Sequence, residues 1–237
     1  EIMSSDWSSD VCSSDLIMAK KNEQLIFGRH PVLDAIKSGA SVDKLLIQQG
    51  VRGEFEKEIR ALSKTHNIPL QTVPKERMTR FTRGNHQGII GFLSLIRYYK
   101  LEDVLPTIYE NGETPLLLLL DGITDIGNFG AIARSAVCCG VHALVIPRKG
   151  VAQINADALK ASAGALVNIP VCRESSLISA IDTLRLGGIQ IVASDLQADK
   201  SITELDFVAP TAIVMGAEGE GVHSTILQKV SETFSIP

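Results

Sequence analysis

The sequence lacks a long uncharged hydrophobic run, which argues against a membrane-spanning helix. The apolar stretch at 115–120 is far shorter than the roughly 20 residues needed to cross a bilayer. No basic start followed by a longer apolar centre indicates a secretory signal. The 237 residues, 45% of them hydrophobic, are enough to bury one large core or two smaller ones. We therefore expect a chain with no membrane partner.

Metal-ligand spacing is also absent. The four cysteines, Cys12, Cys138, Cys139 and Cys172, form no pair at the spacing of a zinc site, so no metal is predicted. The adjacent Cys138 and Cys139 are awkwardly placed for a disulfide. We expect buried free thiols, which suit a reducing cytoplasm best.

The net charge of −4 conceals a strong asymmetry along the chain. Residues 1–17 carry four acidic side chains and no Lys or Arg. Residues 18–110 carry 15 Lys and Arg against 10 Asp and Glu, whereas residues 111–237 carry 8 against 13. A basic front half and an acidic back half permit a phosphate-binding first domain.

The first seventeen residues resemble translated sequencing-adapter read-through. Ser-Ser-Asp recurs at 4–6, 8–10 and 13–15, with no amphipathic period. We expect residues 1–17 to be a non-native or disordered leader. A genuine acidic tail is the alternative.

Two domains follow from the spacing of the apolar residues. Residues 25–97 show a small α/β pattern, residues 98–114 are the expected linker, and residues 115–237 alternate strands and helices, which predicts a mostly parallel α/β sheet. In the first domain we expect a helix over 28–37, strands at 42–48 and 68–73, and helical spacing through Phe55, Ile59 and Leu62. In the second we expect strands at 116–120, 142–146, 167–172, 189–193 and 211–215, with helices near 130–139, 156–162, 177–186 (capped by Ser175 or Ser176) and 222–230.

The first domain contains a basic segment at 74–88, expected to be a loop. It combines four cations with Phe81 and His86. Phosphates attract the cations and nucleobases can stack on the rings, so the segment is a candidate RNA contact. A solvated surface loop is the alternative. The four cations are Lys75, Arg77, Arg80 and Arg83.

Two glycine-rich turns in the second domain each follow an apolar run. One spans 121–136 after Leu116–Leu120, and the other spans 216–221 after 212–215. Such runs predict buried parallel strands whose carboxyl ends open onto ligand-binding loops. We expect the two turns to converge on one pocket.

The polar groups of these turns suggest a chemistry. Asn128 and Gly130 precede an expected helix N-terminus, which favours an anion, and Arg134 one turn further on could bind the same anion. Alternatively, Asn128 is a helix cap and Arg134 a surface residue. Glu218 and Glu220 would repel a phosphate, so Glu218 is better suited to orienting an Arg or a ribose; an acidic surface turn is the alternative.

Residues 121–136 resemble the first signature of the SpoU (TrmH) branch of the SPOUT methyltransferases, and 216–221 resemble the second. Residues 85–88 and 160–164 also look like family segments. The likeness runs from about Leu25 to the end of the chain. It implies 2′-O-methylation of a ribose in RNA with S-adenosyl-L-methionine as methyl donor. The first domain resembles a ribosomal RNA-binding protein, which favours a guanosine in 23S rRNA.

The resemblance also implies a fold, an assembly and a set of residues. The fold is an α/β SPOUT sheet with a carboxyl-terminal trefoil knot, and the assembly is a homodimer with its sites near the interface. The catalytic candidates are Asn128, Arg134 and Glu218. The cofactor candidates are Ser194, Leu196, Met215, Gly216, Gly221 and Ile236, and the RNA-binding candidates, including those of the basic segment, are Arg29, His30, Arg77, Arg80, Arg83, His86, Gln87, Lys160 and Ser162.

The chain departs from the family pattern in two places. Asp125-Ile-Gly-Asn128 lacks the commoner proline, which loosens the turn but keeps Asn128 in place. The third signature should begin near Ser235, and its residues are missing. We therefore expect an incomplete knot, weak cofactor binding and no activity from this truncated chain.

Three other functions are alternatives. A non-catalytic RNA-binding or ribosome-assembly protein could use the same fold, and tRNA could replace rRNA as the target. A dinucleotide-binding oxidoreductase is disfavoured because no GxGxxG occurs near 127–130. The acid expected about 20 residues further on is also missing, where the chain has Pro147-Arg148-Lys149.

Overall fold

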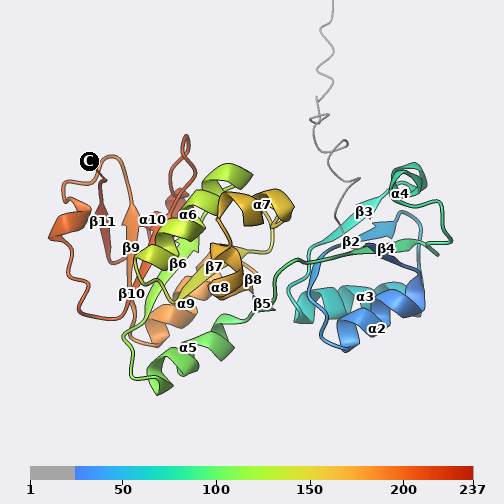
Figure 1. Cartoon of the computed structure of the whole chain (residues 1–237), viewed down its shortest axis with the longest axis horizontal. Coiled ribbons are helices and arrows are strands. Elements are labelled where there is room, and N and C mark those ends of the chain that lie inside the picture. Colours follow the sequence, from blue (N-terminus) through green and yellow to red (C-terminus); the bar gives the residue numbers. More distant parts are fainter. Residues whose placement is uncertain (1–24, 237) are drawn as a thin grey trace, which may run out of the picture.

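The computed structural model describes residues 25–236, which form two β-sheets (Figure 1). The smaller sheet has four strands in the order β1-β4-β2-β3, and the larger has seven in the order β11-β9-β10-β6-β7-β8-β5. The expected leader at 1–17 lies outside the described residues. Within 25–236, no helix is both long and apolar enough to cross a bilayer.

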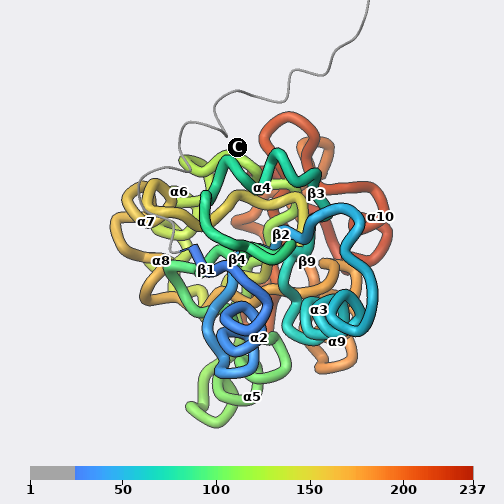
Figure 2. Tube along the Cα trace, turned by 90° about the vertical axis from the view of Figure 1, so that its right-hand side faces the viewer, coloured from blue at the N-terminus to red at the C-terminus, as the bar shows by residue number. Residues whose placement is uncertain are grey.

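The four-stranded sheet has helices on both faces. Figure 2 shows α2 and α3 on one side of this sheet and α4 on the other. Leu45 and Ile47 of β2 belong to the core under α2 and α3, whereas Leu46 belongs to the core under α4. Strand β2 pairs parallel with β3 and antiparallel with β4. The elements are β1 Leu25–Phe27, α2 Arg29–Lys37, β2 Val42–Gln48, α3 Glu54–Thr65, β3 Leu70–Val73, α4 Lys75–Phe81 and β4 Ile89–Leu93.

Helix α4 corrects the expectation of a loop over the basic segment. Met78 on this helix is fully buried, and the Phe81 ring meets the Phe92 ring edge-on with centroids 5.2 Å apart. Residues three apart share one face of a helix, so Met78 and Phe81 both pack on the sheet. The four cations of the segment, of which Arg83 lies beyond the end of α4, are all exposed.

Every strand pair in the seven-stranded sheet is parallel. The sheet comprises β5 Tyr98–Tyr99, β6 Leu116–Leu120, β7 Ala143–Pro147, β8 Val171–Glu174, β9 Gln190–Ser194, β10 Thr211–Met215 and β11 Glu232–Phe234. Its helices are α5 Leu101–Glu110, α6 Ile126–Cys138, α7 Ala156–Ala161, α8 Ala165–Asn168, α9 Leu177–Leu186 and α10 Ser224–Leu227, with a 3-10 turn at Ile202–Glu204. The predicted mostly parallel α/β sheet is therefore confirmed, and the trefoil knot stays a prediction.

The five leucines of β6 show how this sheet becomes the middle of three layers. Leu117 and Leu119 pack against α5, α9 and α10, whereas Leu118 and Leu120 pack against α6, α7 and α8. Side chains alternate between the faces of a strand, so an uninterrupted apolar run suits a strand that is covered on both sides. Figure 1 shows α6 and α7 on one side of the sheet and α5 and α9 on the other.

Several boundaries differ from those expected. The strand expected at 167–172 is replaced by α8 and then β8, because Pro170 holds the residue before it extended and separates the two elements. The helix expected near 222–230 shrinks to the four residues of α10. The segment taken as a linker supplies β5 and α5 to the larger sheet. The cap expected at 175–176 is confirmed at Ser176, whose hydroxyl accepts from Ser179 N at 3.1 Å.

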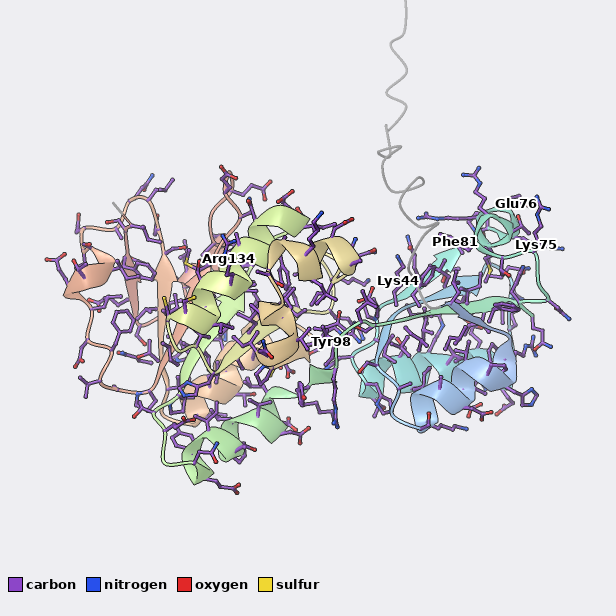
Figure 3. All side chains as sticks on the ribbon, viewed as in Figure 1. Lys44, Lys75, Glu76, Phe81, Tyr98 and Arg134 are labelled. Atoms are coloured by element: carbon purple, nitrogen blue, oxygen red, sulfur yellow. The ribbon has the colours of Figure 1, made fainter. Side chains whose placement is uncertain are left out.

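A buried arginine joins the two sheets. Arg173 on β8 donates to the backbone oxygens of Val42 at 2.6 Å and Asp43 at 2.9 Å, where β2 has a bulge. Its guanidinium also lies 3.8 Å from the centroid of the Tyr98 ring and 3.8 Å from the Asp43 carboxylate. Tyr98 in turn donates its hydroxyl to Asp43 at 2.8 Å. Figure 3 labels Tyr98 in the region where the two sheets meet. Both side chains are held away from water. This burial lowers the pKa of Arg173 and raises the pKa of Tyr98, because each charged form is poorly solvated there.

The cysteines are free, but only one of those described is buried. Cys138 and Cys139 are exposed at the end of α6, which corrects the expectation of buried thiols there. Cys172 is fully buried on β8, and burial raises the pKa of its thiol to about 12. Cys12 lies outside the described residues.

We predict that Arg173→Met lowers the free energy of unfolding by about 3–5 kcal/mol, because the partly buried Asp43 carboxylate and the backbone oxygens of Val42 and Asp43 lose the buried guanidinium. Urea denaturation measures the change. The control is Arg60→Met, since Arg60 makes an exposed pair with Glu56 at 2.9 Å and should cost under about 0.5 kcal/mol. Equal losses in the two variants would contradict the bridging role of Arg173.

We further predict that iodoacetamide at pH 8.5 alkylates Cys138 and Cys139 in the folded protein but leaves Cys172 unmodified. The thiolate is the reactive form, and a pKa of about 12 keeps Cys172 protonated at this pH. The raised pKa favours the folded state at low pH, and this contribution falls as the pH rises from the ordinary thiol pKa toward 12. Mass spectrometry of peptides reads out the labelling; rapid native labelling of Cys172 would refute it.

Candidate active site

The order of strands in the larger sheet creates a switch point between β6 and β10. The chain leaves β6 for β7 on one side, whereas β10 flanks β6 on the other. Met215 at the end of β10 is in register with Leu120 at the end of β6. The loops that follow both strands therefore leave the same edge side by side, where open α/β sheets bind ligands.

Backbone contacts tie these two loops together. Asp121 N donates to Met215 O at 2.9 Å, and the Asp121 carboxylate accepts from His223 N at 2.8 Å. Gly122, at φ +69°, passes so close that an added Cβ would lie 3.5 Å from Ala217 Cβ. The bridging role of Asp121 escaped the sequence reasoning, although an acid directly after a buried strand was a usable signal.

Asn128 and Glu218 meet across this junction. Asn128 Nδ2 donates to Glu218 Oε2 at 3.2 Å, although the residues are 90 positions apart. The predicted meeting of the two glycine-rich turns is thereby confirmed, and the pocket that they were expected to share stays a prediction. Asp125, not Asn128, caps α6 by accepting from Asn128 N at 2.7 Å. The side chain of Asn128 is therefore free of capping and reaches the opposite loop.

Arg134 lies further from this junction than the sequence suggests. Helix α6 begins at Ile126, so Arg134 is more than two turns into it and about 9 Å along the axis from Asn128. The expectation that Arg134 lies one turn into this helix is wrong, and its contact with an anion near the helix N-terminus stays a prediction. Its side chain is exposed on α6 (Figure 3), and no ion pair to another residue within 25–236 holds it.

The second glycine-rich turn is closed by tight backbone packing. Gly221 N donates to Ala217 O at 2.8 Å, and Gly221 has a φ of +68°. A Cβ on Gly216 would lie 2.0 Å from the carbonyl carbon of Gly221, so only glycine fits there. Glu218, Gly219 and Glu220 are exposed at the tip. The turn therefore presents two carboxylates beside the end of β6.

The cofactor candidates lie along neighbouring strand ends. Ser194 ends β9, Met215 ends β10 and is followed by Gly216, and Phe234 of β11 is in register with Ser194. Two of the candidates are apolar and unusually exposed, with Leu196 at 91% and Ile236 at 53%. The carboxylates of the second glycine-rich turn would suit a positive charge on a ligand, and the exposed apolar side chains would suit an apolar ring. The glycines of that turn allow the ligand to approach the backbone closely. Nowhere in the described chain do three His, Cys, Asp or Glu side chains gather to hold a metal.

Three RNA-binding candidates converge in the small domain. Arg29 N donates to Gln87 Oε1 at 3.0 Å, and His86 lies beside them. His86 is only 7% exposed, and its Nδ1 accepts from Gly88 N at 3.1 Å. These residues line a cavity of about 620 Å³, to which Lys75 and Asn85 also contribute.

The remaining RNA-binding candidates are scattered. His30, Arg77, Arg80, Arg83 and Lys160 are exposed. Ser162 is fully buried, and its hydroxyl donates to Leu159 O at 2.9 Å, which places it inside the packing of α7 and α8. Nearby, a Cβ on Gly130 would lie 2.5 Å from Ala161 Cβ, so this glycine lets α6 approach the end of α7.

Comparison with known proteins identifies the same two parts of the chain. Residues 25–99 match the family model described as RNA 2′-O ribose methyltransferase substrate binding, and residues 115–237 match the SpoU rRNA Methylase family. "Putative TrmH family tRNA/rRNA methyltransferase YacO" of Bacillus subtilis is 30% identical over 93% of this chain and 88% of its own length. A protein named "Putative TrmH family tRNA/rRNA methyltransferase" from Staphylococcus saprophyticus is 32% identical over 91% and 86%.

Solved structures share the fold. The SpoU methyltransferase AviRb from Streptomyces viridochromogenes, in complex with AdoMet, aligns at a TM-score of 0.55 with 22% identity over 94% of this chain and 86% of its own. The AdoMet-bound rRNA methyltransferase from Sinorhizobium meliloti aligns at 0.54 with 22% identity over 91% and 78%.

We predict that Gly216→Ala lowers the free energy of unfolding by about 1–3 kcal/mol or more, because the new methyl group meets backbone that cannot move aside cheaply. Gly219→Ala in the same turn is the control, since an added Cβ there meets nothing within 4 Å and the φ is not positive. Urea denaturation measures both. Similar losses at the two positions would contradict the close packing at Gly216.

Proposed function

The chain belongs to the SpoU rRNA methylase family, and we propose that it transfers a methyl group from S-adenosyl-L-methionine to a ribose 2′-hydroxyl of RNA. The finer proposal is a guanosine in ribosomal RNA. The observation that carries the proposed methyl transfer is the hydrogen bond from Asn128 to Glu218. It brings the two signature loops of the family to one point at the switch of the sheet.

The residues at the strand ends fit this methyl donor. Glu218 and Glu220 offer negative charge for a sulfonium or an amino group. Leu196, Met215 and Ile236 offer apolar surface for an adenine ring, and the Gly216–Gly221 turn allows close backbone approach. When bound, the donor supplies an activated methyl group for in-line displacement. Ser194 completes the proposed cofactor set.

The protein then has to place the 2′-hydroxyl and stabilise the charge that develops on it. Holding a hydroxyl in line for attack supplies much of the acceleration in such a transfer. Glu218, oriented by Asn128, accepts a hydrogen bond from a ribose hydroxyl. Both side chains are exposed at the sheet edge, which leaves them open to RNA.

Arg134 is proposed to bind the neighbouring phosphate and to stabilise the developing alkoxide. A guanidinium with a pKa above 12 is a poor base but a good bidentate donor. Its distance along α6 from Asn128 supports a contact with the phosphate next to the ribose and not with the hydroxyl that Glu218 accepts from.

A homodimer is the proposed assembly. Val137, three residues after Arg134, is 40% exposed on α6. Residues three apart lie on one helix face, so an apolar surface accompanies Arg134. Packing of this face against a second copy would bring Arg134 close to the subunit interface.

Deleting the gene in its own organism tests the reaction and the target. We predict the loss of a single 2′-O-methylribose mark from 23S rRNA, restored by the wild-type gene. Sequencing-based mapping of 2′-O-methyl sites in rRNA and tRNA from both strains provides the measurement. Loss of a tRNA mark would replace the proposed target. An intact set of marks, with an rRNA footprint by the protein, would favour the non-catalytic alternative.

The role of Arg134 is tested by Arg134→Lys at the chromosomal locus. Lysine keeps the charge but loses the planar fork, so we predict a turnover about 10²–10³-fold lower, with an unchanged pH profile. The purified enzyme is assayed on RNA from the deletion strain between pH 7 and 10. The control is Arg185→Lys, an exposed arginine of α9.

Two outcomes would contradict this role. Turnover by the Arg134→Lys enzyme that rises with pH toward 10 would indicate a general base, because lysine loses its proton in that range. A wild-type rate would exclude both the phosphate-binding and the base role.

A further inference from the structure

A groove of about 450 Å³ lies between the two sheets, outside the candidate active site. One wall comes from β2 and the start of β3, and the other comes from the loop after β7 together with β8. The charged residues that line it are Asp43, Lys44, Arg148, Lys149 and Arg173. None of the RNA-binding candidates from the sequence is among its lining residues.

The groove has a surplus of positive charge. Its one lining carboxylate, Asp43, already accepts from Tyr98 at 2.8 Å and lies 3.8 Å from Arg173. Lys44, Arg148 and Lys149 form no ion pair with another residue of the described chain. The charge of Arg148 also acts to lower the pKa of Arg173, so these cations are close enough to repel one another. An anion in the groove would relieve this repulsion.

Lys44 spans the groove in a fixed position. Its ammonium donates to Gln153 Oε1 at 3.2 Å and lies 4.4 Å from the centroid of the Phe92 ring. Both partners are neutral, so the positive charge stays available to a ligand. Figure 3 shows Lys44 beside Tyr98 between the two sheets.

The groove is rigidly connected to the candidate active site. Arg173 holds its two walls together through the backbone of β2. The loop after β7 is bonded to the loop after β6, because Ala152 N donates to Ile123 O at 2.8 Å. Strands β6 and β7 are adjacent and parallel, so both loops lie on one edge of the sheet. An RNA strand that extends from the small domain to Asn128 and Glu218 would pass the groove.

We propose that Lys44, Arg148 and Lys149 bind phosphodiester groups of the RNA substrate between the small domain and the active site. This proposal rests on the proposed function. Phosphate recognition follows from the surplus of cations, the fork of Arg148 and the shortage of free carboxylates. The contact positions the strand without reading its sequence, since it involves backbone charge alone.

The test compares two double variants of the whole chain. Arg148→Ala with Lys149→Ala removes two cations of the groove. Lys57→Ala with Arg185→Ala removes the same two residue types from exposed positions on α3 and α9. The probe is a fluorescein-labelled single-stranded RNA of mixed sequence, about 30 nucleotides long so as to span both domains, and anisotropy gives Kd across a range of KCl concentrations.

We expect the groove variant to bind the RNA about tenfold more weakly and the control variant to bind it nearly as the unmodified protein does. The slope of log Kd against log[KCl] should fall by about 1–2 for the groove variant. Circular dichroism checks folding. If the double variant is unfolded, the single variant Lys149→Glu takes its place, because Lys149 is exposed, and the same loss is expected.

Equal affinities and salt slopes for the two double variants would overturn the proposal. A polyglutamate peptide provides a second test. The proposal would also be overturned if this peptide bound the protein as tightly as the RNA does and bound the groove variant more weakly, because the groove would then fit an acidic protein. The methyl mark in the deletion strain is read independently of the groove. If the methyl mark is lost in the deletion strain but the groove variant binds RNA as the unmodified protein does, only the proposed role of the groove is rejected. If the mark is intact in the deletion strain, the proposed function is rejected.

Discussion

The parallel pairing of β6 with β10 is the constraint on which the rest of the site depends. It aligns Leu120 with Met215, so the loops after two strands far apart in the chain leave the sheet together. The contacts of Asp121 and the bond from Asn128 to Glu218 follow from that alignment. A shift of one residue along either strand would turn its leucines or valines to the opposite layer, so the core and the site protect the same register.

Polar contacts of Arg173 join the two sheets, and no hydrophobic cluster among residues 25–236 includes side chains from both. Arg173 offers its guanidinium to backbone oxygens at a bulge of β2, and Tyr98 and Asp43 complete its surroundings. Buried charges of this kind contribute little net stability when complete but cost much when one partner is lost. Their effect here is geometric, since they set how the small domain faces the carboxyl edge of the large sheet.

Local patterns predicted most of the fold. The strands expected at 42–48, 116–120 and 211–215 match β2, β6 and β10. For β6 the reason is clear, because an uninterrupted apolar run has few alternatives when both faces of the strand are covered. Short elements were missed where tertiary packing outweighs local preference. Helix α4 is stabilised by Met78 and Phe81, which pack on the small sheet. Strand β5 forms because Tyr98 pairs with Val171, a residue distant in sequence.

The sequence by itself determined the parallel α/β class, because apolar runs that alternate with helical spacing can be read directly. The resemblance of its two glycine-rich turns to family signatures indicated the family and named the catalytic candidates. Only the tertiary structure decided that Asp125 caps α6, that Arg134 lies more than two turns into this helix and that Cys138 is exposed. It alone placed Lys44 opposite Arg148. These relations depend on where helices start and which strands become neighbours, and distances between segments remote in the chain are not encoded in any local pattern.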